Sequence, residues 1–92
     1  MSRVFRNDTA RLIVEFRDYK GNTIKPMNIS LTIYDERENV IVTIESSRIK
    51  QEDNIYFYDY THSSRDNYIF EFKGMYENLP VLCRQFVEVA FV

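Results

Sequence analysis

Cysteine, histidine and glycine are scarce in this sequence, and tryptophan is absent. Cys83 is the only cysteine, so no disulfide can form within the chain and nothing indicates an oxidising compartment. Cys83 and the only histidine, His62, are too few to fill a tetrahedral zinc site. The two glycines, Gly21 and Gly74, cannot form the glycine-rich loop that cradles phosphates. We therefore expect no cofactor.

A surplus of positive charge is also missing, as are long apolar runs. The chain has 12 Lys and Arg against 14 Asp and Glu, whereas nucleic-acid binders normally carry a basic surplus. The start, MSRVFRND, has no apolar run of the kind found in signal peptides, and no later run approaches the roughly 18 residues that span a membrane. We expect a soluble protein that is made in the cytoplasm and binds neither nucleic acid nor membrane.

What the chain does contain is apolar and aromatic residues in short alternating runs. Of its 92 residues, 45% are hydrophobic, and the seven Tyr and seven Phe favour pleated, half-buried strands over helices. This length allows one core and leaves no room for a second domain. We expect residues 10–92 to form that domain, and residues 1–9 to form a flexible N-terminal arm.

The first half of the domain reads as three strands. In 10–17, apolar residues alternate with polar ones, as in a strand with one buried face. The turn residues of 18–22 follow, and 28–34 alternates again after Pro26. The polar residues 35–39 predict a hairpin to a third strand at 40–44.

The second half predicts further strands and ends with a long one. Residues 48–54 contain one apolar residue among polar and charged ones, which is typical of a short edge strand or a loop. Alternating aromatics at 55–60 and 68–73 predict two strands joined by a turn. Gly74 and the polar residues after it are expected to end the second of these. The last strand starts at Pro80, and its pattern changes at 84–86, which predicts a bulge.

Six or seven short strands with no long helical period predict an all-β fold, an antiparallel sandwich of two sheets. The layout runs from LIVEFRDYKGNTIKPMNISLTIYD through NIYFYDY and NYIFEFKG to RQFVEVAFV. It resembles the small immunoglobulin-like domains that occur as stand-alone virion proteins of tailed bacteriophages and, more distantly, macroglobulin-type modules of bacterial surface proteins. The resemblance spans about residues 10–92 and implies an immunoglobulin-like sandwich.

The resemblance also implies a role. It points to a non-catalytic structural protein of the virion, which binds the assembled phage capsid as an auxiliary or decoration protein and has capsid or other virion proteins as partners. Two alternatives stay open. The chain could be a head-tail connector or neck subunit, or it could be an adhesion or carbohydrate-binding module. Fold likeness of this kind suggests a role without identifying a contact surface.

Catalytic residues are hard to find in this sequence. His62 lies in a predicted turn beside Ser63 and Ser64, and adjacency in sequence does not create the hydrogen-bonded geometry of a catalytic triad. A lone thiol such as Cys83, within an apolar strand, is usually a packing residue. We expect a solvated loop at His62, an inert thiol at Cys83 and no enzymatic activity.

Calcium is the one metal that the residue types leave open. The acidic pairs Asp35 with Glu36 and Glu52 with Asp53 offer the oxygen ligands that calcium prefers. Their spacing matches no known calcium loop, and charged loops that keep a protein soluble explain them equally well. We expect no metal site.

The tyrosines and the N-terminal arginines supply the candidate binding residues. Tyr56, Tyr58 and Tyr60 share one face of their strand, either as an exposed binding surface or, as we favour, lining the core with their hydroxyls at its rim. Phe57 would then face outward and join an exposed apolar patch. The first 17 residues lean basic, which could attract an acidic surface, although a solvated terminus is the alternative. The resulting candidate partner surface consists of Arg3, Arg6, Ile13, Phe57 and Ile69.

Overall fold

The computed structural model describes residues 2–5 and 9–90, which form eight strands and one short 3-10 turn, η1 (Ser46–Arg48). The all-β prediction is confirmed for these residues, and the number of strands exceeds the expected six or seven. The strands are β1 (Ser2–Phe5), β2 (Thr9–Val14), β3 (Met27–Asp35), β4 (Val40–Ile44), β5 (Lys50–Glu52), β6 (Ile55–Thr61), β7 (Tyr68–Tyr76) and β8 (Leu79–Ala90).

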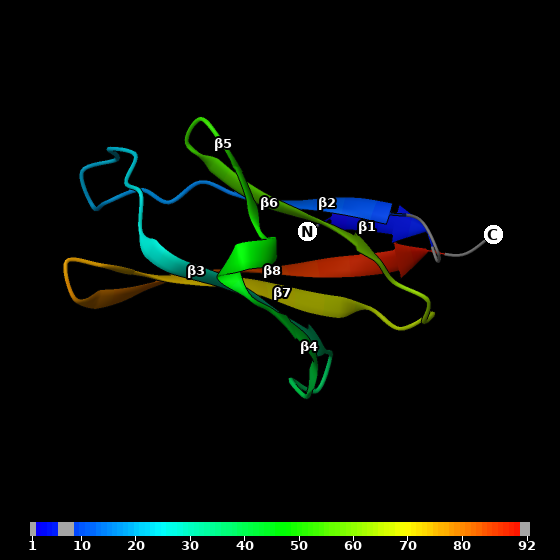
Figure 1. The fold of residues 1–92 in the computed structure, drawn as a ribbon. Helices are drawn as coiled ribbons and strands as arrows, with labels where there is room; N and C mark the ends of the chain where they lie inside the picture. The colour runs from blue at the N-terminus through cyan, green and yellow to red at the C-terminus, as the bar shows by residue number, and fades with distance from the viewer. Residues whose placement is uncertain (1, 6–8, 91–92) are drawn as a thin grey trace.

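The strands form two sheets that face each other, as Figure 1 shows. The larger sheet has the order β1-β8-β7-β3-β4, and the smaller one has the order β2-β6-β5. All described pairs are antiparallel except β1 with β8, which is parallel and begins where Ser2 lies opposite Val87. The structure therefore corrects two expectations. Ser2–Phe5, predicted as part of a flexible arm, is a strand, and the sandwich is not wholly antiparallel.

The core lies between the sheets and follows the predicted alternation. Every second residue of β2, β3 and β7 points inward, because successive side chains of a strand lie on opposite faces. Leu31, Ile33, Tyr68 and Phe72 are fully buried. The remaining buried members of the cluster are Leu12, Val14, Phe16, Ile24, Ile29, Ile44, Tyr56, Phe70, Val87 and Val89.

Two turns are organised by an aspartate in the same way. Asp18 Oδ1 accepts the backbone N–H groups of Lys20 and Asn22, both at 2.9 Å. In the β3–β4 hairpin, Asp35 Oδ1 accepts from Arg37 at 2.9 Å and from Asn39 at 2.8 Å. Such side-chain bonds to the backbone two and four residues ahead favour chain reversal. Both predicted turns are confirmed.

The β7–β8 hairpin differs from its prediction. β7 runs through Gly74 and ends at Tyr76, and a tight turn at Glu77 and Asn78 leads into β8. β7 continues through Gly74 because the packing of the sheet leaves no room for a side chain at this position. A Cβ there would lie 2.7 Å from the Ile29 side chain. The pairing of β7 with β8 runs without a shift from Tyr68 opposite Val87 to Tyr76 opposite Leu79, so the predicted bulge at 84–86 is absent. The apolar pattern changes there because Gln85, opposite the buried Phe70, is a polar residue at an inward position.

Candidate functional site

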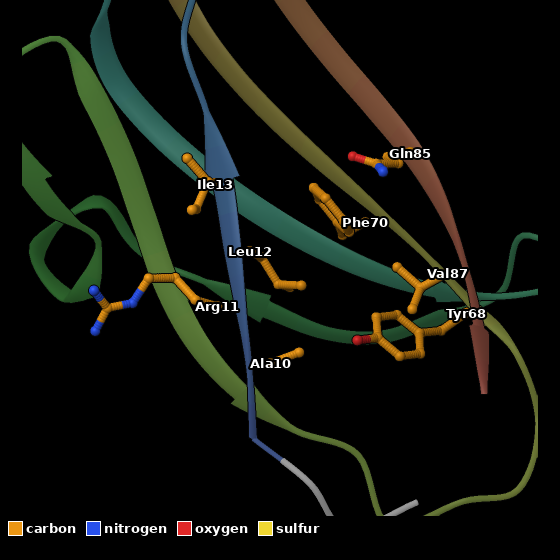
Figure 2. A pocket seen from close by; sticks show the side chains of 8 residues that line it. All are labelled: Ala10, Arg11, Leu12, Ile13, Tyr68, Phe70, Gln85 and Val87. Carbon is orange, nitrogen blue, oxygen red and sulfur yellow. The ribbon is translucent and has the colours of Figure 1, made fainter. Parts of the chain in front are cut away.

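One side of the sandwich is open between β2, at an edge of the smaller sheet, and β8 of the larger sheet. A cleft of about 380 Å³ lies there, seen from close by in Figure 2. Both inward and outward residues of β2 line it, so the strand contributes its edge as well as one face. The described lining residues are Ala10, Arg11, Leu12, Ile13, Tyr68, Phe70, Gln85 and Val87.

Tyr68 supplies the most unusual atom of this cleft. Its side chain is fully buried, and its hydroxyl has no hydrogen-bond partner in the structure. Figure 2 shows the hydroxyl oxygen directed from β7 toward β2. Burial raises the pKa of Tyr68 to about 12, with a smaller contribution from Tyr60. An unsatisfied buried hydroxyl costs about 1–3 kcal/mol, so it is an unfavourable feature unless something binds it.

Exposed apolar residues gather at the end of the molecule where β7 turns into β8. Met27, Met75 and Pro80 lie opposite one another on β3, β7 and β8, on the outer face of the larger sheet. Leu82 lies two residues further along β8 on the same face. Met27 is 70% exposed and Leu82 is 59% exposed. We call Met27, Met75, Pro80 and Leu82 the hairpin-end patch.

Arg84 forms a charge cluster next to this patch. Its Nε and Nη2 lie 2.9 and 2.8 Å from Glu71 Oε2, and its Nη1 bonds Glu38. The guanidinium also lies 5.0 Å from the centre of the Tyr34 ring. These bonds, to Glu38 first and Glu71 second, raise the pKa of Arg84. The side chain is thus held over the outer face of the sheet by residues of the neighbouring elements.

His62 is buried, which corrects the expectation of a solvated loop. It is 5% exposed, and its ring packs against Tyr60 and Tyr68 at 5.6 and 4.6 Å between centroids. Nε2 lies 3.0 Å from the Asp66 carbonyl, which can only accept, so Nε2 carries a proton. Nδ1 then accepts from the Tyr60 hydroxyl at 2.8 Å. Both ring nitrogens hold the loop against the core, and burial by aromatic rings was not readable from THSSRD.

The structure brings together only two members of the predicted partner surface, Ile13 and Phe57, which lie opposite each other on β2 and β6. Ile13 is 47% exposed on the outer face of the smaller sheet and lies at the rim of the cleft. Ile69 is half-buried on the outer face of the larger sheet, between Tyr34 and Phe86. Arg3 lies in β1 opposite Glu88, and Arg6 lies outside the described residues.

Phe57 was predicted to be exposed, and that prediction is wrong. It does face away from the core, yet it is only 7% exposed. Ile13 and Lys50 flank it in register on the neighbouring strands, and the Arg11 guanidinium lies 4.2 Å from its ring centre. Asp59 fixes that guanidinium through two hydrogen bonds at 2.9 and 3.2 Å. A cation over an aromatic face is favourable, so Phe57 is covered by its own sheet.

The predictions for the tyrosine strand and for the cysteine are closer to the structure. Tyr56 is buried, and Tyr58 and Tyr60 are half-buried with their rings packed against the core. Burial raises the pKa of Tyr56 and of Tyr60. Cys83 is a half-buried free thiol that packs against the core, and burial raises its pKa.

The acidic pairs considered for calcium do not assemble with further ligands. In the described part of the chain, no three His, Cys, Asp or Glu side chains lie close enough together to hold a metal ion. Asp35 instead caps its turn, and the hydrogen bonds from Asn39 lower the pKa of its carboxyl. Within residues 2–5 and 9–90, no helix is long and apolar enough to cross a membrane.

Comparisons with protein-family models, with curated proteins and with solved structures found no match for this chain. The candidate site therefore consists of features of this structure alone: the cleft, the hairpin-end patch and the edge of β8 between them. Sequence reasoning identified Ile13 at its rim and missed Tyr68 and Leu82. A Tyr at an inward position of a strand, where a hydroxyl needs a partner, is the signal that could have indicated the cleft.

Proposed function

We propose that this chain is a non-catalytic structural protein of a phage virion, with an immunoglobulin-like sandwich that binds the assembled capsid. The sequence resemblance supports the virion setting, and the surface of the sandwich supports the binding role. The observation that carries the binding role is the hairpin-end patch. Exposed apolar side chains that cluster on one face of a small protein are typical of a site that another protein covers.

The order of the strands supports the immunoglobulin-like part of the proposal. In such sandwiches, strands B, E and D form one sheet, and strands G, F and C form the other, which a further strand extends in variable-type domains. The orders β2-β6-β5 and β8-β7-β3-β4 agree with these two sheets strand by strand. This chain lacks the disulfide of antibody domains, because Cys83 is its only cysteine.

The composition of the patch also favours a protein partner. Methionine adapts its shape to irregular surfaces, and Met27 and Met75 lie side by side in register. Lys73 and Arg84 border the patch on the outer face of the same sheet. An apolar centre with a charged rim is the usual composition of a protein interface.

Co-sedimentation with purified phage capsid shells tests the proposal, with light scattering of the protein alone as a second measurement. We expect the chain to sediment with the shells in many copies and Leu82→Lys to lose most of that binding. Val40→Lys is the matched control, because Val40 on β4 is 60% exposed and Leu82 is 59% exposed. Failure to sediment with shells would contradict capsid binding, and a closed ring in solution would favour a connector subunit instead.

A further inference from the structure

The edge of β8 is only partly covered. β7 pairs with β8 along one side from Leu79 to Val87, whereas β1 pairs along the other side only from Val87 to Ala90. In Figure 1, β1 lies along the C-terminal part of β8. Among the described residues, no strand pairs with the outer side of β8 between Leu79 and Arg84. Unpaired strand edges are ready templates for another strand.

The geometry of the hairpin identifies the backbone groups that this edge presents. The turn at Glu77 and Asn78 has φ of 51° and 65°, as in a two-residue type I′ turn. The flanking pair, Tyr76 with Leu79, is then hydrogen-bonded, and bonded pairs alternate with non-bonded pairs along an antiparallel ladder. Leu82 and Arg84 fall in non-bonded pairs. Their N–H and C=O groups therefore point away from β7, toward the uncovered side.

The edge carries little of the protection that strand edges usually have. Pro80 interrupts it at one end only. Arg84 is the one charged residue from Leu79 to Arg84, and its guanidinium is bound to Glu71 and Glu38 over the outer face of the sheet. A charge held in that way does not guard the edge as a free lysine would.

The cleft begins where the uncovered stretch of β8 ends, at Gln85, and suits a side chain. Its walls include the apolar side chains of Leu12, Phe70 and Val87. The Tyr68 hydroxyl is buried there without a partner. A strand placed beside β8 alternates its side chains between the outer face and the space between the sheets. The inward side chain that lies opposite Gln85 would enter the cleft, and β1 shows that a parallel strand can pair with this side of β8.

We propose that the uncovered edge of β8 binds an extended segment of another protein, which adds to the larger sheet in line with β1. The segment bonds the backbone of Leu82 and Arg84 and places one apolar side chain in the cleft. This inference rests on the proposed function in that it names how a partner protein is held, and the hairpin-end patch flanks the same edge at Leu82.

A library of displayed random peptides of about ten residues, the upper length of an ordinary strand, is the probe. We expect selection on the full chain to yield peptides with alternating apolar residues. Their binding should slow the amide hydrogen exchange of Leu82 and Arg84, measured by NMR. The Cys83 amide bonds β7 in this register and should exchange slowly with and without peptide, so it serves as an internal reference.

Two variants separate the backbone contribution from the side-chain contribution. Leu82→Pro removes an N–H that the fold does not use, so it should weaken peptide binding about tenfold or more. Leu82→Ala keeps that N–H and should retain most of the affinity. Ala10→Leu fills the cleft from β2 and should also weaken binding, which keeps the test valid if the proline variant fails to fold.

Several outcomes would overturn the inference. These are a library that yields no binder, peptides that bind without slowing exchange at Leu82 and Arg84, and equal affinity for Leu82→Pro and Leu82→Ala. Exchange protection that appears with protein concentration alone would assign the edge to a second copy instead.

The two proposals fail separately, because peptide binding without capsid binding contradicts only the proposed function. Capsid binding that Leu82→Pro leaves unchanged contradicts only the strand addition.

Discussion

Gly74 shows how one residue without a side chain permits a packed sheet. A Cβ at this position would lie 2.7 Å from Ile29 Cδ1 and 2.8 Å from Pro26 Cβ. Ile29 and Pro26 are both buried, so they have little room to move. We expect Gly74→Ala to lower the free energy of unfolding by about 1–3 kcal/mol, as overpacking usually does. Urea denaturation followed by circular dichroism measures this.

Gly21 is the control for this prediction, because its requirement is conformational. No atom lies within 4 Å of a Cβ built there, but φ is +85°. Gly21→Ala should cost about 1–2 kcal/mol through backbone strain, and Gly21→Asn should recover part of this because Asn tolerates positive φ. Gly74→Asn should instead be worse than Gly74→Ala. A Gly74→Ala protein as stable as wild type would show that Pro26 and Ile29 yield easily.

The buried hydroxyl of Tyr68 is predicted to lower the stability of the folded protein at neutral pH. Removing an unpartnered buried hydroxyl relieves a desolvation cost, so Tyr68→Phe should increase the free energy of unfolding by about 1 kcal/mol. A loss of stability in this variant would show that the hydroxyl has a partner such as a buried water. Urea denaturation at pH 7 makes the comparison.

The same tyrosine predicts how stability changes in alkali. Burial raises its pKa to about 12, whereas a tyrosine in the unfolded chain titrates near about 10. Because the pKa is higher in the folded state, this titration leaves the free energy of unfolding unchanged below pH about 10. The free energy of unfolding then falls as the pH rises through about 12. The stability advantage of Tyr68→Phe over wild type should therefore widen across this window. Thermal unfolding at a series of alkaline pH values tests it, and a constant difference would contradict it.

At the scale of one element, the β3–β4 hairpin depends on the carboxylate of Asp35. Hydrogen bonds from Asn39 lower its pKa in the folded state. A lowered pKa contributes stability above the unfolded value of about 3.9, and this is lost as the pH falls through the folded value. Asp35→Asn removes the charge, so its stability deficit at pH 7 should shrink as the pH falls below about 4. Thermal unfolding between neutral and acidic pH measures it.

A neighbouring carboxylate provides the control for the hairpin. Glu36 lies in the same turn and is exposed. Glu36→Gln should change the melting temperature much less than Asp35→Asn at pH 7. If the deficit of Asp35→Asn stays constant down to acidic pH, the carboxylate charge is not what stabilises the turn, and the geometry of its oxygen alone is responsible.

Most elements could be predicted because their signals are local. The alternation in 28–34 and the polar spacer before 40–44 determine β3, β4 and their hairpin without distant contacts. The end of β7 could not be predicted in this way. Gly74 is a strand breaker by composition, and only Ile29 and Pro26, which pack against it, explain why the strand continues. A local rule fails where a residue is chosen for a contact far away in the sequence.

At the scale of the whole molecule, β1 covers part of the β8 edge. Its parallel pairing with Val87–Ala90 satisfies backbone groups that would otherwise be open to another chain. Deleting residues 1–5 should therefore lower the melting temperature and also promote self-association. Differential scanning calorimetry and sedimentation velocity measure the two effects.

The two effects separate two roles of β1. A deletion variant that is less stable but stays monomeric would show that β1 contributes packing and does not guard the edge. Adding Leu82→Pro to the deletion removes one more edge donor, so it should reduce any self-association that the deletion causes. Self-association that is unchanged in the double variant would assign it to another edge, such as β4.

The sequence by itself determined the fold class, the inward faces of the main strands and the two aspartate turns. These depend on the alternation of side chains along a strand and on hydrogen bonds between residues close in sequence, both of which can be read from the sequence directly. It also determined that Tyr56, Tyr58 and Tyr60 share a face, although not what that face meets.

Only the tertiary structure decided which edges stay open and which side chains are covered. Phe57 is buried because Arg11, Ile13 and Lys50 come from other strands, and their register is set by pairing over long distances. The cleft at Tyr68 exists because β2 and β8 lie in different sheets and leave one side of the sandwich unfilled. Strand order and register are properties of the assembled sheets, so the candidate binding site follows from them and not from any one segment of the chain.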